Sequence, residues 1–217
     1  FDTQHGYLDD ADVATMLRRL EHVPIGTAVR LPSTAPGPIG RVLDAGADAV
    51  IVAMVETPEQ AAAAVAATRY APNGIRSFGP LRAALGVNPA DLEARAGVYV
   101  MIETAKALPA VADICAVPGL AGIYVGPADL AISMGLGLAE MTTAPAMIDA
   151  IDSIQGAAAS CRVVTADRPA SGWRGDTISS RGSVLSFCSD SFCDVAACST
   201  MARSTWPDAS AWASASP

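Results

Sequence analysis

Two short apolar runs joined by one helical stretch constrain the fold more than any other part of the sequence. Residues 98–102 and 122–125 have the length and the β-branched content of buried parallel strands. The Ala-rich residues 104–117 between them precede Pro118-Gly119, so the pattern predicts a helix that ends there. In a strand–helix–strand unit the two strands run parallel, and both therefore end at the same edge of the sheet.

A carboxylate follows each of the two runs. Glu103 comes directly after the first, and Asp129 lies four residues after the second. This edge of a parallel sheet is where α/β proteins build their active sites, and carboxylate oxygens suit hard cations. The pattern predicts a site for Mg²⁺ or Mn²⁺, and the alternative is a pair of solvated acids without a function.

The remaining alternation of elements is typical of a parallel α/β fold. Further strands are expected at residues 26–32 and 49–55, helices at 9–21, 38–45, 61–69, 91–96 and 144–159, and a long loop at 72–86. The pattern alone does not separate a barrel from an open doubly wound sheet. No Gly-rich phosphate-binding motif follows any strand, which weakens the nucleotide-binding alternative.

Length and charge narrow the possible partners. A chain of 217 residues forms one domain. Its net charge of −8 and its pI near 4.6 argue against nucleic acid or an anionic membrane as partner, and no apolar run approaches the ~20 residues that span a bilayer. The cytoplasm is the default location. The chain begins in mid-motif without Met, so we expect it to lack about one β/α unit at its front.

A protein can supply an electron sink through a lysine Schiff base or a metal ion. Lys106 is the single lysine, and its place three residues after Glu103 predicts a solvated position. A metal is therefore favoured. His5 lies at a strand end and is either a structural residue or an acid/base, with Asp2 three residues earlier placed to orient its ring. Arg30 also ends a strand and is either a surface ion-pair partner or a residue that stabilises an anion.

Several motifs, in order, resemble the HpcH/HpaI aldolase/citrate lyase family. They are D-T-Q-H-G at 2–6, V-R-L-P at 29–32, V-L-D-A-G at 42–46, M-I-E-T at 101–104 and G-P-A-D-L-A-I-S-M-G at 126–135. The resemblance implies a (β/α)₈ TIM barrel of the phosphoenolpyruvate/pyruvate type and a metal-dependent aldolase that cleaves 4-hydroxy-2-keto acids to pyruvate and an aldehyde. It implies a homo-oligomer, a trimer or hexamer.

The same resemblance assigns roles to individual residues. Glu103 and Asp129 would bind Mg²⁺, Mn²⁺ or Co²⁺, and the amides of the 126–129 segment would hold the substrate carboxylate. His5 would act as acid/base, Arg30 would stabilise the enolate, and Asp44 would assist the histidine across a subunit interface. The candidate residues are thus catalytic His5, Arg30, Asp2 and Asp44, substrate-binding Gly126, Pro127, Ala128 and Asp129, and metal-binding Glu103 and Asp129. Met101 departs from the family, which often has Gln there, so substrate preference or rate should differ.

The composition changes near residue 161. Residues 161–217 contain 12 serines against five before them, all three Trp, four of the five Cys and a single Leu. Three of those cysteines, Cys188, Cys193 and Cys198, have no metal-binding spacing. We therefore expect a barrel domain at 1–160, truncated at the front, and an aberrant tail at 161–217 that arises from a shifted reading frame; a natural Ser-rich tail is the alternative.

Two other functions stay open on the sequence alone. One is a lyase of the citrate or malyl-CoA type, which would share the two metal ligands. The other is an inactive barrel fragment that acts only as an interaction surface, since a barrel without its last strands would leave unpaired edges.

Overall fold

The computed structural model describes residues 1–161 and 164–166, so most of the predicted tail at 161–217, and with it the reading-frame hypothesis, lies outside the described residues. The strands are β1 (Ala28–Leu31), β2 (Ala49–Val52), β3 (Gly97–Ile102), β4 (Gly122–Val125) and β5 (Val164–Ala166). The helices are α1 (Asp10–Arg19), α2 (Pro36–Asp44), α3 (Pro58–Ala66), α4 (Pro89–Arg95), α5 (Val111–Cys115), α6 (Pro127–Ser133) and α7 (Pro145–Cys161), with 3₁₀ turns η1 (Ala83–Leu85), η2 (Leu108–Ala110) and η3 (Leu138–Glu140).

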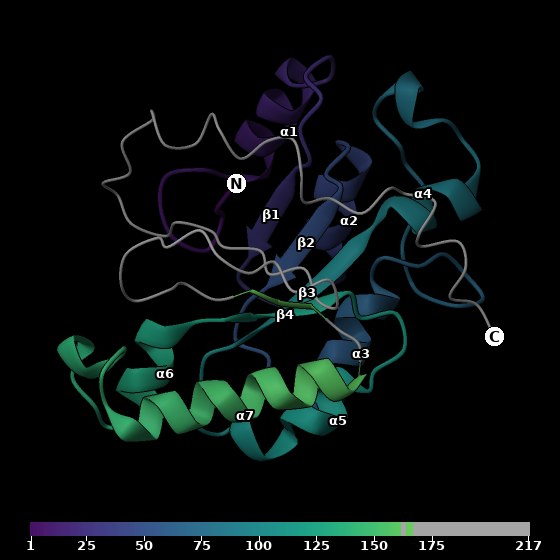
Figure 1. Cartoon of the computed structure of the whole chain (residues 1–217). Helices are drawn as coiled ribbons and strands as arrows, with labels where there is room; N and C mark the ends of the chain where they lie inside the picture. Colours follow the sequence, from purple (N-terminus) through teal and green to yellow (C-terminus); the bar gives the residue numbers. More distant parts are fainter. Residues whose placement is uncertain (162–163, 167–217) are drawn as a thin grey trace.

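The five described strands form one parallel sheet in the order β1-β2-β3-β4-β5 (Figure 1). Each strand pairs with the next one in the sequence and the order never reverses, unlike in a doubly wound sheet. Successive right-handed crossovers place the connecting helices on one face, which is the winding of a barrel, and α1, α2, α3, α5 and α7 share one buried cluster there. Asp2 adds an isolated parallel bridge to Arg30, so the first residues continue the sheet beyond β1. The predicted TIM barrel is confirmed for this part of the fold.

Alternating strand residues divide the core between the two faces of the sheet. The outer face packs against α1, α2, α3, α5 and α7 through residues such as Val29, Val50, Val100 and Ile123, all fully buried. The inner face carries a separate buried cluster of smaller and mixed residues: Ala28, Ala49, Ile51, Ala53, Tyr99, Met101, Ala121 and Tyr124. The helical coat thus closes the outside, and the inner cluster lies beneath the carboxyl ends of the strands.

Most expected elements are present near their expected bounds, and one helix prediction was wrong. The helix predicted at 104–117 is a turn, then η2, then the five-residue α5. Pro109 explains the break, because it has no N–H to continue a helical hydrogen-bond ladder. Strand β5 was not predicted at all. Helix α3 begins with a capping box formed by Thr57 and Gln60, three residues before the predicted helix start at 61.

No helix in the described ranges is both long enough and apolar enough to cross a membrane.

Candidate active site

Glu103 is the buried acid at the carboxyl end of β3. Its exposed fraction is 1%, and its Oε1 accepts a 2.6 Å hydrogen bond from the main-chain N–H of Met54. Met54 follows β2 with φ of 58°, the one non-glycine residue with positive φ among those described. A left-handed backbone is costly for a residue with a side chain, and such conformations cluster at functional sites. The positive φ of Met54 directs its N–H at the carboxylate of Glu103, and the hydrogen bond fixes Oε1, one of the two carboxylate oxygens.

The second oxygen of Glu103, Oε2, is buried and has no hydrogen-bond partner within the described part of the chain. Gly126 lies directly against it: a Cβ on that glycine would come within 2.6 Å of Oε2 and of the Glu103 Cβ. Glycine is therefore required sterically at this position. An unpaired carboxylate oxygen facing a glycine indicates a ligand-binding position, because burial without a partner is otherwise costly.

The pKa of Glu103 is raised above its ordinary value. Burial is the main cause and the negative charge of Asp129 adds to it, whereas the Met54 amide and the positive charges of Arg30 and His5 oppose it. The four predicted groups Glu103, Asp129, Arg30 and His5 thus lie within electrostatic reach of one another. Asp129 is exposed and stands in the first turn of α6, directly beyond β4.

The 126–129 segment offers two main-chain donors rather than four. The N–H of Gly126 donates to the carbonyl of Ile102 at 3.1 Å, and Pro127 has no N–H. The amides of Ala128 and Asp129 remain as the first-turn donors of α6 that have no intrahelical acceptor. Within this turn, the N–H groups of Ala128 and Asp129 are therefore the two that could donate to an anion.

Arg30 and Asp2 form an ion pair at the end of β1. The Arg30 Nε donates to Asp2 Oδ1 at 2.9 Å and its Nη2 contacts Oδ2. Burial alone would raise the pKa of Asp2, but hydrogen bonds from Arg30 and from the main chain of His5 and Gln4 outweigh it, so the pKa is lowered. The pKa of Arg30 is raised. Burial lowers it, but the hydrogen bonds and charge of Asp2, together with the charges of Glu103 and Tyr124, raise it by more.

His5 is exposed. Its main-chain N–H, and not its ring, donates a hydrogen bond to Asp2 Oδ1 at 3.2 Å.

Lys106 has an exposed side chain, and its Nζ pairs with Glu56 Oε2 at 2.6 Å, which fits the predicted solvated position.

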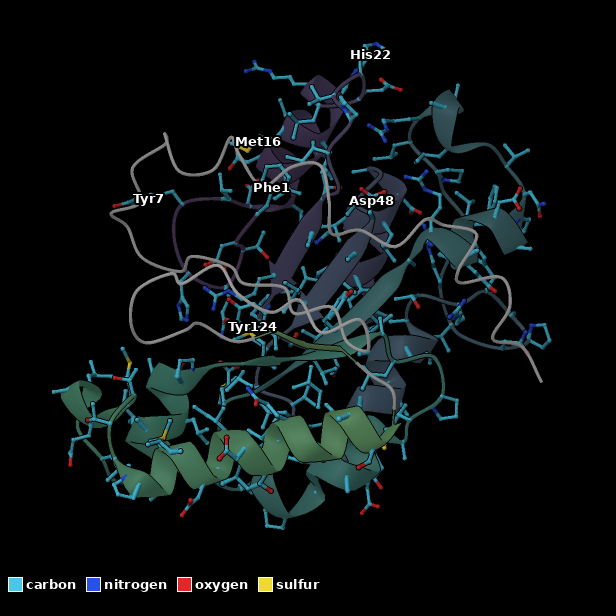
Figure 2. All side chains as sticks on the ribbon, viewed as in Figure 1. Phe1, Tyr7, Met16, His22, Asp48 and Tyr124 are labelled. Atoms are coloured by element: carbon cyan, nitrogen blue, oxygen red, sulfur yellow. The ribbon has the colours of Figure 1, made fainter. Side chains whose placement is uncertain are left out.

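Asp44 does not join the other candidates within this chain. It is the last residue of α2, which leads back to the start of β2, so it lies at the amino end of the sheet. There it forms an ion pair with Arg76 at 2.7 Å. Figure 2 shows Asp48, just before β2, at this same end of the molecule, away from Tyr124 on β4.

Residues 1–184 match the sequence pattern of the HpcH/HpaI aldolase/citrate lyase family. The chain belongs to this family. A hydroxypyruvate/pyruvate aldolase from Rhizorhabdus wittichii is 38% identical over 137 residues, which are 62% of this chain and 55% of that protein. A 4-hydroxy-2-oxovalerate aldolase from Novosphingobium aromaticivorans is 37% identical over 174 residues, which are 78% and 64% of the two chains. The chain thus spans between about half and two thirds of these relatives.

Solved structures agree with the family assignment. A crystal structure of an HpcH/HpaI aldolase/citrate lyase family protein from Burkholderia cenocepacia superposes with a TM-score of 0.71 at 30% identity. The match covers 86% of this chain and 77% of the other. The motifs that the sequence analysis quoted therefore lie on the fold expected of this family.

The residues present fit a divalent cation, as the family implies. Glu103 offers one buried oxygen without a partner, and Asp129 supplies a second negative charge nearby. The described residues contain no cluster of three or more His, Cys, Asp or Glu side chains placed to hold a metal. Two carboxylates with open positions suit Mg²⁺ or Mn²⁺, which keep several water or substrate oxygens. Two positions without a signal in the sequence also belong to this end of the sheet. Met54 donates its main-chain N–H to Glu103, and Tyr124 lies on the inner face of β4 (Figure 2).

Proposed function

We propose that this chain is the catalytic part of a metal-dependent aldolase that cleaves a 4-hydroxy-2-keto acid into pyruvate and an aldehyde. The observation that carries the proposal is the buried Oε2 of Glu103, which has no partner among the described residues and faces Gly126 beside Asp129. The names of relatives at 37–38% identity support the same reaction class. The activity stays a proposal because the chain spans only part of those proteins.

Substrate recognition follows from the turn between β4 and α6. The amides of Ala128 and Asp129 at the N-terminus of α6 would hold the carboxylate of the keto acid, with Gly126 and Pro127 shaping the turn. Glu103 and Asp129 would hold Mg²⁺, Mn²⁺ or Co²⁺, and the bound ion would act as the Lewis acid that withdraws electrons from the keto group. Lys106, exposed and paired with Glu56, does not offer the dry amine that a Schiff base needs.

The proton transfers would fall to His5 and the charge stabilisation to Arg30. His5 would take the proton of the 4-hydroxyl through a water, and the C3–C4 bond would break to release the aldehyde and leave the enolate of pyruvate. Arg30, with its raised pKa, stays cationic and would stabilise the negative oxygen of that enolate. Reprotonation at C3 then yields pyruvate.

Asp44 could assist His5 only from a second copy of the chain, because it lies at the opposite end of its own sheet. This role therefore requires the homo-oligomer, a trimer or hexamer, that we propose together with it. A cytoplasmic location is part of the same proposal.

Pyruvate release tests the proposed function directly. The protein is given a panel of 4-hydroxy-2-keto acids, with and without EDTA, and pyruvate is measured with lactate dehydrogenase. We expect release that EDTA abolishes and that Mg²⁺, Mn²⁺ or Co²⁺ restores. Cleavage of citrate or acyl-CoA substrates instead would establish the lyase alternative, and no cleavage of any substrate would establish an inactive fragment. Borohydride trapping of pyruvate on Lys106 would overturn the metal mechanism.

A further inference from the structure

The carboxylate of Asp2 accepts four hydrogen bonds, two from Arg30 and two from the main chain. Its Oδ1 accepts from the main-chain N–H of Gln4 at 3.0 Å, from that of His5 at 3.2 Å and from Nε of Arg30 at 2.9 Å. Its Oδ2 accepts from Nη2 of Arg30. An ionised carboxylate has about four acceptor positions, two on each oxygen. Oδ1 is therefore fully used by the two main-chain N–H groups and Arg30, and Oδ2 faces the Arg30 guanidinium. None of these bonds comes from the ring of His5.

The main chain fixes the same pair from both sides. The Arg30 N–H donates to the carbonyl of Phe1 at 2.8 Å, and the Arg30 carbonyl accepts from the Thr3 N–H at 3.0 Å and from the Thr3 hydroxyl at 2.6 Å. Asp2 is thus the direct parallel-bridge neighbour of Arg30. Because neighbouring bridge residues present their side chains to the same face, the pairing of Asp2 with Arg30 is built into the sheet.

The ion pair also fixes the orientation of the guanidinium group. Asp2 holds the Nε–Nη2 edge in a bidentate arrangement, which restricts rotation of the planar group. The Nη1 nitrogen is the one that Asp2 does not hold. Glu103 and Tyr124 both raise the pKa of Arg30 through their charges, so the guanidinium that Asp2 holds lies within electrostatic reach of the candidate metal ligand.

We infer that Asp2 is a positioning residue for Arg30 and not the partner of the His5 ring. The inference rests on the proposed function, in which Arg30 stabilises the enolate oxygen. A donor that is already oriented stabilises developing charge without reorganising during the reaction. Asp2 contributes to the His5 loop only through the main-chain N–H groups of Gln4 and His5.

Asp2→Asn separates these two contributions. The asparagine oxygen can still accept from the two main-chain N–H groups, whereas its NH₂ group would face Nη2 of Arg30, donor against donor. We expect kcat for pyruvate release to fall roughly 10- to 100-fold, with a smaller change in KM, because a misplaced catalytic group costs rate more than ground-state binding. The melting temperature should stay within a few degrees of wild type.

Two double-mutant cycles on the metal-loaded full chain then identify the partner of Asp2. If Asp2 acts through Arg30, adding Asp2→Asn to Arg30→Met should change kcat less than threefold. Adding it to His5→Ala should cost the same 10- to 100-fold as in wild type. The reverse pattern, or a full loss in both backgrounds, overturns the inference.

A second readout does not depend on activity. In ¹⁵N-arginine-labelled protein, the Nε–H signal of Arg30, assigned by its loss in Arg30→Met, should shift and exchange faster in Asp2→Asn and stay in place in His5→Ala. An unchanged signal in Asp2→Asn overturns the inference. If wild type releases no pyruvate from any substrate, the proposed function fails, and this signal still decides whether Asp2 positions Arg30.

Discussion

The two ends of the sheet each carry an Asp–Arg pair, and the two pairs differ in what surrounds them. At the carboxyl end, Arg30 and Asp2 have side-chain exposures of 17% and 37%. At the amino end, Arg76 and Asp44 have 1% and 15%. Arg76 places its guanidinium over the ring of Tyr70, 4.9 Å from the centroid, and its Nε and Nη1 find no hydrogen-bond acceptor in the described ranges. One pair is open to a ligand and the other is closed by packing.

This difference shows that residue type alone does not determine what an ion pair does. The Asp44–Arg76 pair joins α2 to the loop before α4, so it holds two segments together. The Asp2–Arg30 pair lies within electrostatic reach of Glu103, where the proposed reaction would develop negative charge. The carboxyl end should therefore respond to substitution mainly in chemistry, and the amino end mainly in stability.

The largest expected effect is on turnover. His5→Ala should lower kcat about 10²- to 10⁴-fold while metal affinity is kept, because general acid–base catalysis contributes that much. His22→Ala is the matched control, since His22 is exposed beyond the end of α1 at the amino end (Figure 2). Steady-state kinetics measures kcat for both variants. Equal losses in His5→Ala and His22→Ala would contradict the claim that the carboxyl end of the sheet carries the chemistry.

Stability should show the opposite asymmetry. Arg76→Met leaves the partly buried Asp44 without its cation, so the loss of unfolding free energy should lie at the lower end of that for a buried pair, about 3 kcal/mol. Arg30→Met should cost about 1 kcal/mol or less, because the pair at the carboxyl end is partly solvated. Urea unfolding of the two variants measures both values. Similar losses would show that the two pairs are equivalent.

A methyl group at Gly126 tests whether the close approach of this glycine to Glu103 Oε2 matters for metal binding. Gly126→Ala places a Cβ within 2.6 Å of Oε2 and should lower metal affinity roughly 10- to 100-fold, comparable to losing a supporting contact of a metal ligand. Gly40→Ala is the control, because a Cβ there meets nothing within 4 Å on the helix that ends at Asp44. Calorimetric titration with Mn²⁺ compares them, and equal affinities would show that Gly126 has no role at the site.

The sequence predicted which residues share one edge of the sheet better than it predicted which side chains contact one another. Strand-end positions placed Glu103, Asp129, Arg30 and His5 at one edge, because parallel strands all end there. The sequence did not distinguish Asp2 from Asp44 as helpers of His5, since a side-chain partner depends on which segments pack together. Asp2 pairs with Arg30 through a bridge of separated segments, and Asp44 pairs with an arginine in a loop.

Two features of the backbone could not be predicted from the sequence: the left-handed conformation of Met54 and the break in the helix expected at 104–117. The positive φ of Met54 leaves no compositional signal, because methionine is not a residue that favours this conformation. The helix expected at 104–117 was predicted from Ala content, and Pro109 outweighed that propensity.

The smallest expected effect is a pH dependence of the metal-free protein. Burial raises the pKa of Glu103, so its contribution to stability is present below the unfolded pKa and is lost as the pH rises through the folded pKa. With EDTA present, the melting temperature of wild type should therefore fall relative to Glu103→Gln as the pH rises above about 4.3, the ordinary value for glutamate. A difference that stays constant from pH 4.5 to pH 8 would contradict this.

A direct measurement of metal binding tests whether the carboxyl end of the sheet holds a divalent cation between Glu103 and Asp129. Mn²⁺ binding is measured by electron paramagnetic resonance on the wild type, Glu103→Gln, Asp129→Asn and, as the control from the opposite end, Asp44→Asn. We expect one site in the wild type that survives in Asp44→Asn and is severely weakened in each of the other two variants. Wild-type affinity in both Glu103→Gln and Asp129→Asn, or no Mn²⁺ bound by the wild type, would contradict it.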